Sequence, residues 1–119
     1  MSTVANIVVG IVALIHVYIL VLEMFLWERP VGLHTFHITE DFASATREMA
    51  ANQGLYNGFL AAGLFWSLYT GDIHVQRFFL GCVVTAGVYG ALTVHAKTLW
   101  VQAAPAAVGL VLLGLAPVY

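Results

Sequence analysis

The feature that most constrains this chain is an apolar run over residues 3–27, which is long enough to cross a bilayer. Two misfits, His16 and Glu23, interrupt it in the stretch HVYILVLEMFLW. A run of about 18 or more apolar residues predicts a transmembrane helix. We therefore expect a first membrane span here, and its imidazole and carboxylate need an explanation of their own.

The composition extends this prediction to the whole chain. Of the 119 residues, 61% are hydrophobic and 8% are charged, whereas soluble domains average about a quarter charged residues. Four cationic residues and a net charge of −2 exclude a nucleic-acid-binding surface. The opening MSTVAN lacks the positive region of a secretory signal, and the single Cys82 excludes a disulfide framework. An integral membrane protein is expected.

The apolar runs predict an all-α fold, a transmembrane four-helix bundle in a single domain. Trp27 suits a membrane interface, and Pro30 is expected to stop the first helix. The connections between the later spans are short, so neighbouring helices should be antiparallel. The four predicted spans are residues 3–27, 52–69, 77–94 and 98–118.

The one sizeable connection, residues 28–51, should contain a short helix. Thr39 can serve as an N-cap, and Phe42, Ala45 and Met49 form a narrow apolar stripe at helical spacing. We expect this segment to lie at the membrane interface between the first and second spans, or to lead continuously into the second span.

Cationic residues in the connections predict the orientation. Arg29, Arg47 and Lys97 fall on one side of the bundle and Arg77 on the other. Because cytoplasmic loops carry an excess of Lys and Arg, the count favours a multi-pass protein of a bacterial cell (inner) membrane with both termini outside the cytoplasm.

Polar side chains gather at one predicted end of the bundle, and all four helices contribute. The opposite half offers little beyond Ser67, Tyr69 and Asp72, and His16 alone lies deep. The residues that should converge at the polar end are Glu23, Gln53, Asn57, Tyr56, Tyr89 and Gln102.

The same residues carry a resemblance to a known family. HVYILVLEMFLW, AANQGLYNGFLAAGLFW, AGVYGALTV and VQAAPA resemble blocks of the DUF1304 family of small bacterial membrane proteins. The resemblance covers essentially the whole chain, and NQGLYNGFLAAG is its most specific part. It implies four transmembrane helices and no assigned function. The stretch HTFHIT departs from the family pattern, so His34 and His37 support no family-wide activity.

Glu23 has two interpretations. A charge at the bilayer centre costs roughly 2.5–3.5 kcal/mol, and less near the span's end, so Glu23 could be an interfacial anchor or a partner for Lys97 or Arg47. The alternative is a carboxylate that lines a cavity with Gln53 and Asn57.

His16 needs a hydrogen-bond partner at mid-membrane, and Thr85, Tyr56 or a backbone carbonyl could supply it. Seven residues separate His16 from Glu23, so both share one helix face about 10.5 Å apart along the axis. They cannot pair directly.

The amides and glycines of the second span each have a structural and a functional interpretation. Gln53 and Asn57 are four residues apart and could either hold helices together or form part of a site. Gly54 and Gly58 permit close backbone approach, either inside the bundle or in a homodimer.

Metal chemistry and the common soluble mechanisms are not expected. His34, His37 and His95 could in principle hold zinc, but one short spacing in a loop is weak support, and we expect no metal and no cofactor. No phosphate-binding loop, nucleophile elbow or HExxH motif occurs. Pro105 should free the carbonyl of Val101 and bend the last helix near the polar end.

Together these features predict binding or transport of a small amphipathic molecule in a one-sided pocket, surrounded by membrane lipids. Glu23, Gln53, Asn57 and Tyr89 would form its walls, with His16 at the floor, and Gln102 at the rim. Proton coupling through Glu23 is the mechanism if transport occurs. The alternatives are a membrane enzyme that uses Glu23 and His16 for acid–base chemistry, which their axial offset disfavours, and an accessory subunit of a larger complex.

Overall fold

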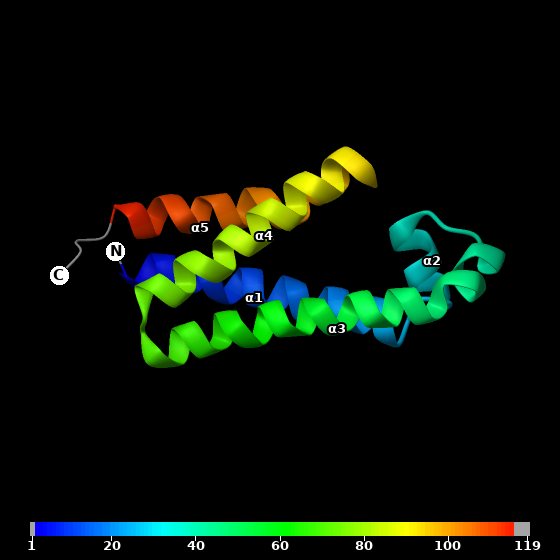
Figure 1. Cartoon of the computed structure of the whole chain (residues 1–119), viewed down its shortest axis with the longest axis horizontal. Helices are drawn as coiled ribbons and strands as arrows, with labels where there is room; N and C mark the ends of the chain where they lie inside the picture. Colours follow the sequence, from blue (N-terminus) through cyan, green and yellow to red (C-terminus); the bar gives the residue numbers. More distant parts are fainter. Residues whose placement is uncertain (1, 116–119) are drawn as a thin grey trace. The chain divides into compact units, whose positions relative to one another are not determined.

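A computed structural model describes residues 2–115 of the chain, and all regular secondary structure in this range is helical (Figure 1). The chain divides into two units, and α1 and α3 each contribute to both. Unit 1 comprises Met1–Ile15 with Leu60–Tyr119, and unit 2 comprises His16–Phe59. The elements are α1 (Ser2–Met24), α2 (Pro30–Phe36), α3 (Glu40–Thr70), α4 (Ile73–Thr93), the π-helical η1 (Leu99–Ala103) and α5 (Ala104–Gly114).

In unit 1, segments of α1, α3, α4 and α5 share one apolar core. Small residues and β-branched residues dominate this core, so the helices approach closely there. Its fully buried members include Val9 on α1, Leu64 on α3, Leu80 on α4 and Ala106 on α5.

Helix α4 begins earlier than the sequence predicts. The predicted start at residue 77 is four residues too late, because Asp72 caps the helix. The Asp72 carboxylate accepts hydrogen bonds from the backbone N–H groups of His74 and Val75, at 2.9 and 3.4 Å. Such a cap satisfies N–H groups that have no partner within the helix. The connection from α3 is therefore only Gly71, at a φ of 69° that favours glycine, and Asp72.

The last predicted span is divided in the structure. A π-helical segment, η1, precedes Pro105, and α5 continues to Gly114. The bend expected at Pro105 stays a prediction. Pro105 has no N–H to donate, and the backbone just before it shows π-type pairing, in which the Ala104 N–H bonds to the Leu99 carbonyl. Residues 116–118 of the predicted span lie outside the described residues.

In unit 2, α1 ends at Met24, three residues before the predicted end at Trp27. The N–H groups of Phe25 and Leu26 both bond to the Val21 carbonyl, at 3.0 and 3.2 Å, which closes the helix. Contrary to the prediction, Pro30 does not stop α1. It lies in the first turn of α2, a position that suits its fixed φ and missing N–H.

The connection between α1 and α3 is shorter and more ordered than predicted. Helix α2 was not expected, and α3 runs unbroken from Glu40 through Thr70. The continuous alternative is therefore the observed one, and no separate interfacial helix exists at residues 39–51. Thr39 caps α3 as predicted, accepting from the Phe42 N–H at 3.2 Å.

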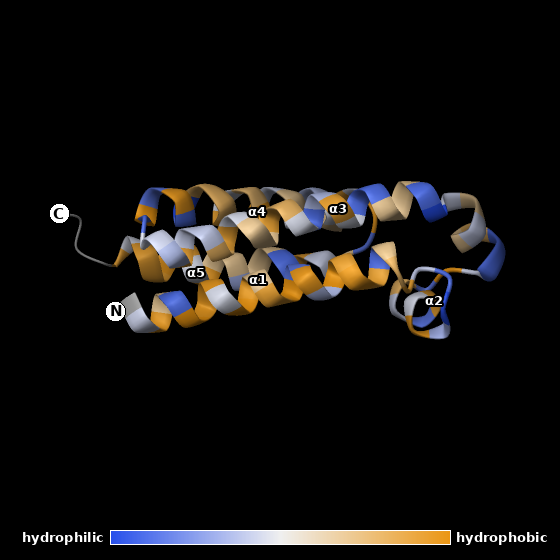
Figure 2. Cartoon of the chain, turned by 90° about the horizontal axis from the view of Figure 1, so that it is seen from below, coloured by the Kyte–Doolittle hydropathy of each residue, from blue (hydrophilic) through white to orange (hydrophobic). Residues whose placement is uncertain are grey.

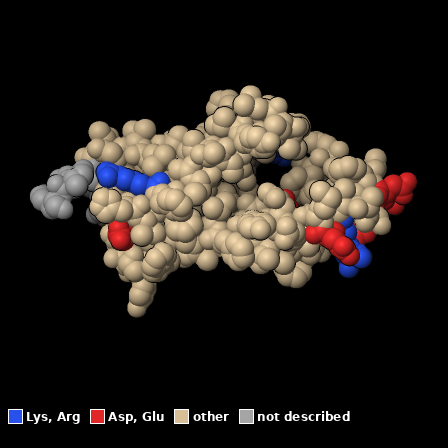
Figure 3. Space-filling view, viewed as in Figure 1, with Lys and Arg blue, Asp and Glu red and all other residues tan. Residues whose placement is uncertain are grey.

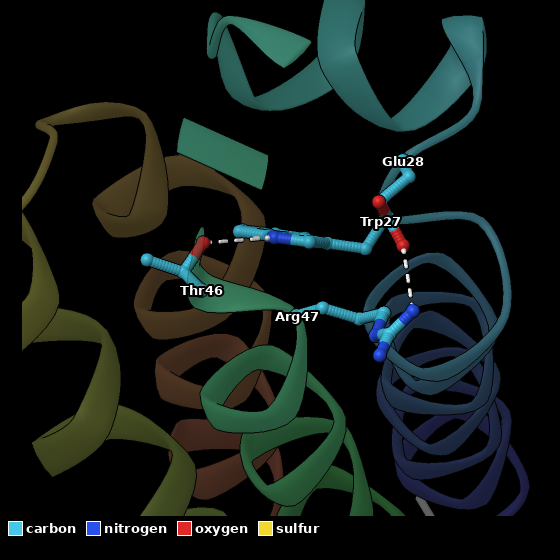
Figure 4. A network of polar contacts seen from close by, with 4 residues as sticks. All are labelled: Trp27, Glu28, Thr46 and Arg47. Carbon is cyan, nitrogen blue, oxygen red and sulfur yellow. Dashed lines mark hydrogen bonds and ion pairs between the residues drawn. The ribbon is translucent and has the colours of Figure 1, made fainter. Parts of the chain in front are cut away.

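Two side-chain contacts join the start of α3 to the segment that follows α1 in unit 2 (Figure 4). Trp27 donates its indole N–H to the Thr46 hydroxyl at 3.1 Å. Glu28 and Arg47 form an ion pair at 3.7 Å, and both side chains are largely exposed. Exposed pairs of this kind contribute little, so the tryptophan contact is the firmer of the two.

Hydropathy and charge are unevenly distributed. In Figure 2, α1 is coloured mainly as hydrophobic, and in Figure 3 charged side chains gather in unit 2 around α2 and the start of α3. Two helical segments, Thr3–Met24 and Ile73–Thr93, are long and apolar enough to cross a membrane, by length and composition alone. The apolar segment Leu99–Gly114 is shorter.

Candidate functional site

The candidate site in unit 2 centres on Glu23, in the last turn of α1. Its side chain is buried, with 9% of its surface exposed. The C-terminal end of a helix carries partial negative charge, and an anion there is disfavoured by about 0.3–1 kcal/mol. Neither burial nor position therefore favours a carboxylate here on grounds of helix stability.

Asn57 on α3 is the partner of Glu23. Its amide Nδ2 donates to Glu23 Oε1 at 2.6 Å and to the Gln53 backbone carbonyl at 3.2 Å. Asn57 is 5% exposed. A carboxylate offers about four lone-pair sites, so one amide leaves acceptor capacity for a further donor.

Glycines on α3 bring the two helices close enough for this bond. A Cβ atom at Gly54 would lie 2.6 Å from Met24 Cγ and 3.1 Å from Glu23 Cβ, and one at Gly58 would lie 2.6 Å from Leu20 Cδ1. The small-residue motif thus serves packing within the chain. The homodimer suggested for the same motif stays a prediction.

The remaining predicted residues of unit 2 do not join this pair. Gln53 is exposed and contributes only its backbone carbonyl, which accepts from Asn57 Nδ2. The Tyr56 ring is 57% exposed and packs edge-on against Phe59, with centroids 5.6 Å apart. Within unit 2, the side chains that meet at this site are one carboxylate and one amide.

Of the two cations proposed as partners of Glu23, only Arg47 can be assessed. The pairing with Lys97 and the choice between an anchor and a cavity wall stay predictions. Arg47 pairs with Glu28, so its proposed role as the partner of Glu23 is wrong. His16 is fully buried on α1, about two turns and 10.5 Å from Glu23 along the axis. His16 is therefore too far along the α1 axis to contact Glu23 directly.

Tyr89 and Gln102 belong to unit 1. The Tyr89 side chain is 69% exposed on α4, and Gln102 is half-buried in η1. Their convergence with Glu23 stays a prediction.

Sequence reasoning missed a polar group of unit 1. Gln76 on α4, 4% exposed, donates to Asn6 Oδ1 on α1 at 3.4 Å. Arg77 Nη2 donates to the Leu113 carbonyl at the end of α5, at 3.2 Å. The expectation that the half of the bundle opposite the predicted polar end offers few polar side chains is therefore wrong. The available signal was Asp72: as an N-cap it places Gln76 and Arg77 inside a helix.

The imidazoles show no metal-binding arrangement within residues 2–115. The rings of His34 and His37 lie 6.2 Å apart, centroid to centroid. Among the described side chains, no group of three His, Cys, Asp or Glu residues could hold a metal ion.

Comparisons with known proteins place the chain in a family. The family model described as "Protein of unknown function (DUF1304)" matches residues 10–114. The chain is also similar to "Uncharacterized protein YpaA" of Lactococcus lactis, with 27% identity over 105 residues that cover 85% of this chain and 88% of YpaA. No solved structure matches the chain.

Proposed function

The chain belongs to the DUF1304 family, described as of unknown function, and from this premise we propose a function built on the site: a four-span membrane protein that binds or transports a small amphipathic molecule at Glu23 and Asn57. The observation that carries the proposal is the 2.6 Å hydrogen bond between these two buried side chains. Glu23 lies on α1 and Asn57 on α3, and the two side chains meet between these helices in a largely apolar part of the chain.

The membrane location is supported by what the helices expose. Large apolar side chains of α1 are exposed, among them Ile7 at 57% and Leu14 at 60%, and the same holds for Phe78 at 66% on α4. Soluble proteins rarely expose contiguous apolar surfaces of this extent. The second half of α3 and the η1–α5 segment would supply the other two spans, in a bacterial cell membrane with both termini outside.

The binding role follows from the chemistry of Glu23. Ionisable residues inside membrane segments are rare, because insertion costs about 2.5–3.5 kcal/mol at the bilayer centre, and they usually mark ligand or proton pathways. Simple helix association can be achieved by an amide alone. The carboxylate would accept a donor group of the ligand, while the ligand's apolar part lies among the leucine and phenylalanine side chains.

Proton coupling is the mechanism we propose for transport. A proton and the ligand's donor group would compete for the same Glu23 oxygens, so protonation would release the ligand. Asn57 would hold the carboxylate in place in both states. His16 takes no part in this exchange because of its axial distance from Glu23.

Native mass spectrometry after mild detergent extraction tests the proposal. The proteins are wild type, Glu23→Gln, Asn57→Leu and the control Glu48→Gln, which removes an exposed carboxylate of α3. We expect one discrete small molecule on wild type and on the control, and its loss from both site variants. If all four proteins carry only bulk lipid and melt alike, Glu23 is an anchor and the protein is better explained as a subunit.

A further inference from the structure

A second feature with ligand-binding chemistry lies in unit 1, along α4. A shallow groove of about 740 Å³, wide open to the surroundings, follows one face of this helix and is lined by α4 residues alone, among them Phe78, Gly81, Cys82, Thr85 and Tyr89, with Arg77 at one end. A Cβ atom placed on Gly81 would meet nothing within 4 Å. The groove therefore has free space at its centre.

The groove is apolar along its length and cationic at one end. Arg77 is the only Lys, Arg, Asp or Glu residue within α4. One of its guanidinium nitrogens bonds to the Leu113 carbonyl, and a guanidinium has five N–H donors. The nearby Asp72 carboxylate accepts two backbone N–H groups at the helix start.

The length of the groove matches a lipid chain. Twelve residues separate Arg77 from Tyr89, which is roughly 18 Å of α-helix. Arg77 lies near the start of the candidate span Ile73–Thr93, where a lipid headgroup would be found. An acyl chain from that headgroup would run in the direction of Gly81 and Tyr89.

We propose that the α4 groove binds an anionic phospholipid, with its phosphate on Arg77 and one acyl chain along Gly81 and Cys82. Arginine binds phosphate through paired charge-assisted hydrogen bonds. The proposal rests on the membrane location proposed above and is independent of the Glu23 site.

A second copy of the chain fits the groove less well. A parallel symmetric pair through this face would bring two Arg77 guanidinium groups together. Helix α4 has no acidic residue to neutralise them. The small residues alone do not compensate for that repulsion.

The test is native mass spectrometry of protein purified from vesicles of equimolar phosphatidylglycerol and phosphatidylcholine with identical chains. We expect wild type to retain phosphatidylglycerol with a preference of about tenfold, the scale of one charge-assisted contact. Arg77→Gln should lose the preference. Arg77→Lys keeps the positive charge and should recover part of the preference for phosphatidylglycerol. Such a recovery would show that the preference depends on the charge at this position.

A groove-filling variant provides an independent test. Gly81→Leu places a side chain into open space, so the fold should be kept while retention of phosphatidylglycerol falls. Glu48→Gln, which changes an exposed carboxylate of α3, is the control and should retain the lipid as wild type does. Equal retention of both lipids by wild type, or unchanged preference in Arg77→Gln, would overturn the proposal.

Two further outcomes would also overturn it. Efficient Cys82 cross-linking into a dimer that carries no selected lipid would assign the groove to a second copy. Membrane fractionation distinguishes failure of both proposals from failure of the lipid proposal alone. A protein found outside the membrane fraction contradicts both proposals. A membrane protein with no lipid preference contradicts only the lipid proposal.

Discussion

In each of the two units, a glycine lets two helices pack closely, but the side chains beside the two contacts differ. In unit 2, Gly54 lets α3 approach α1 beside the buried Glu23, and in unit 1, Gly87 lets α4 approach η1 at Ala103. The core of unit 1 near that contact is apolar, with Leu80 and Val83 fully buried. Close packing in this chain therefore does not need a carboxylate, and the presence of Glu23 in unit 2 calls for a functional explanation.

The largest expected effect comes from filling the tight contact of unit 1. A Cβ at Gly87 would lie 2.6 Å from Ala103 N and 3.0 Å from its Cα. Because backbone atoms cannot move aside as a side chain can, Gly87→Leu should lower the free energy of unfolding by about 3 kcal/mol or more. Reversible unfolding in detergent, followed by circular dichroism, measures this. Unchanged stability would mean that the close approach of α4 and η1 is not maintained.

Filling the contact of unit 2 should have a smaller effect on stability and a large one on binding. At Gly54 the nearest atom is Met24 Cγ, a side-chain atom that can shift, so Gly54→Leu should cost about 1–3 kcal/mol. The separated helices should also lose the Glu23–Asn57 bond and the ligand. Gly81→Ala, at an open helical position, is the control and should be neutral or stabilising by about 0.5–1 kcal/mol.

The polar pair of unit 1 should have the smallest effect. Gln76 and Asn6 meet at 3.4 Å, and hydrogen bonds between membrane helices contribute about 0.6 kcal/mol on average. Gln76→Leu should therefore change the unfolding free energy by about that amount and leave the retained ligand of unit 2 unchanged. A loss of ligand would show that the two polar groups are not independent.

The sequence predicted helices well where hydropathy decides, but it missed two helix ends that local hydrogen bonds determine. Long apolar runs located α1 and α4, but the end of α1 depends on how Phe25 and Leu26 bond to Val21, which hydropathy does not express. The start of α4 depends on Asp72. The continuity of α3 was one of two alternatives, because a narrow apolar stripe fits both a surface helix and the first turns of a longer one.

The site was predicted in part for a similar reason. Spacing identified Glu23, Gln53 and Asn57 as candidates, and the structure brings Glu23 and Asn57 together. Spacing could not show that the Gln53 side chain is exposed while Asn57 is buried against Glu23, since that requires the register between the two helices. The pairing of Gln76 with Asn6 joins residues 70 positions apart and needs the same information.

The central claim is that Glu23 binds a ligand rather than holding helices together, and one comparison tests it most directly. Wild type and Glu23→Gln are prepared in the same detergent, and each sample is measured for retained small molecule and for the free energy of unfolding in ligand-free form. Glutamine keeps an acceptor for Asn57, so we predict a stability change below about 1 kcal/mol together with complete loss of the small molecule. A variant that retains the same molecule as wild type, or that loses it only because it unfolds, would contradict the claim.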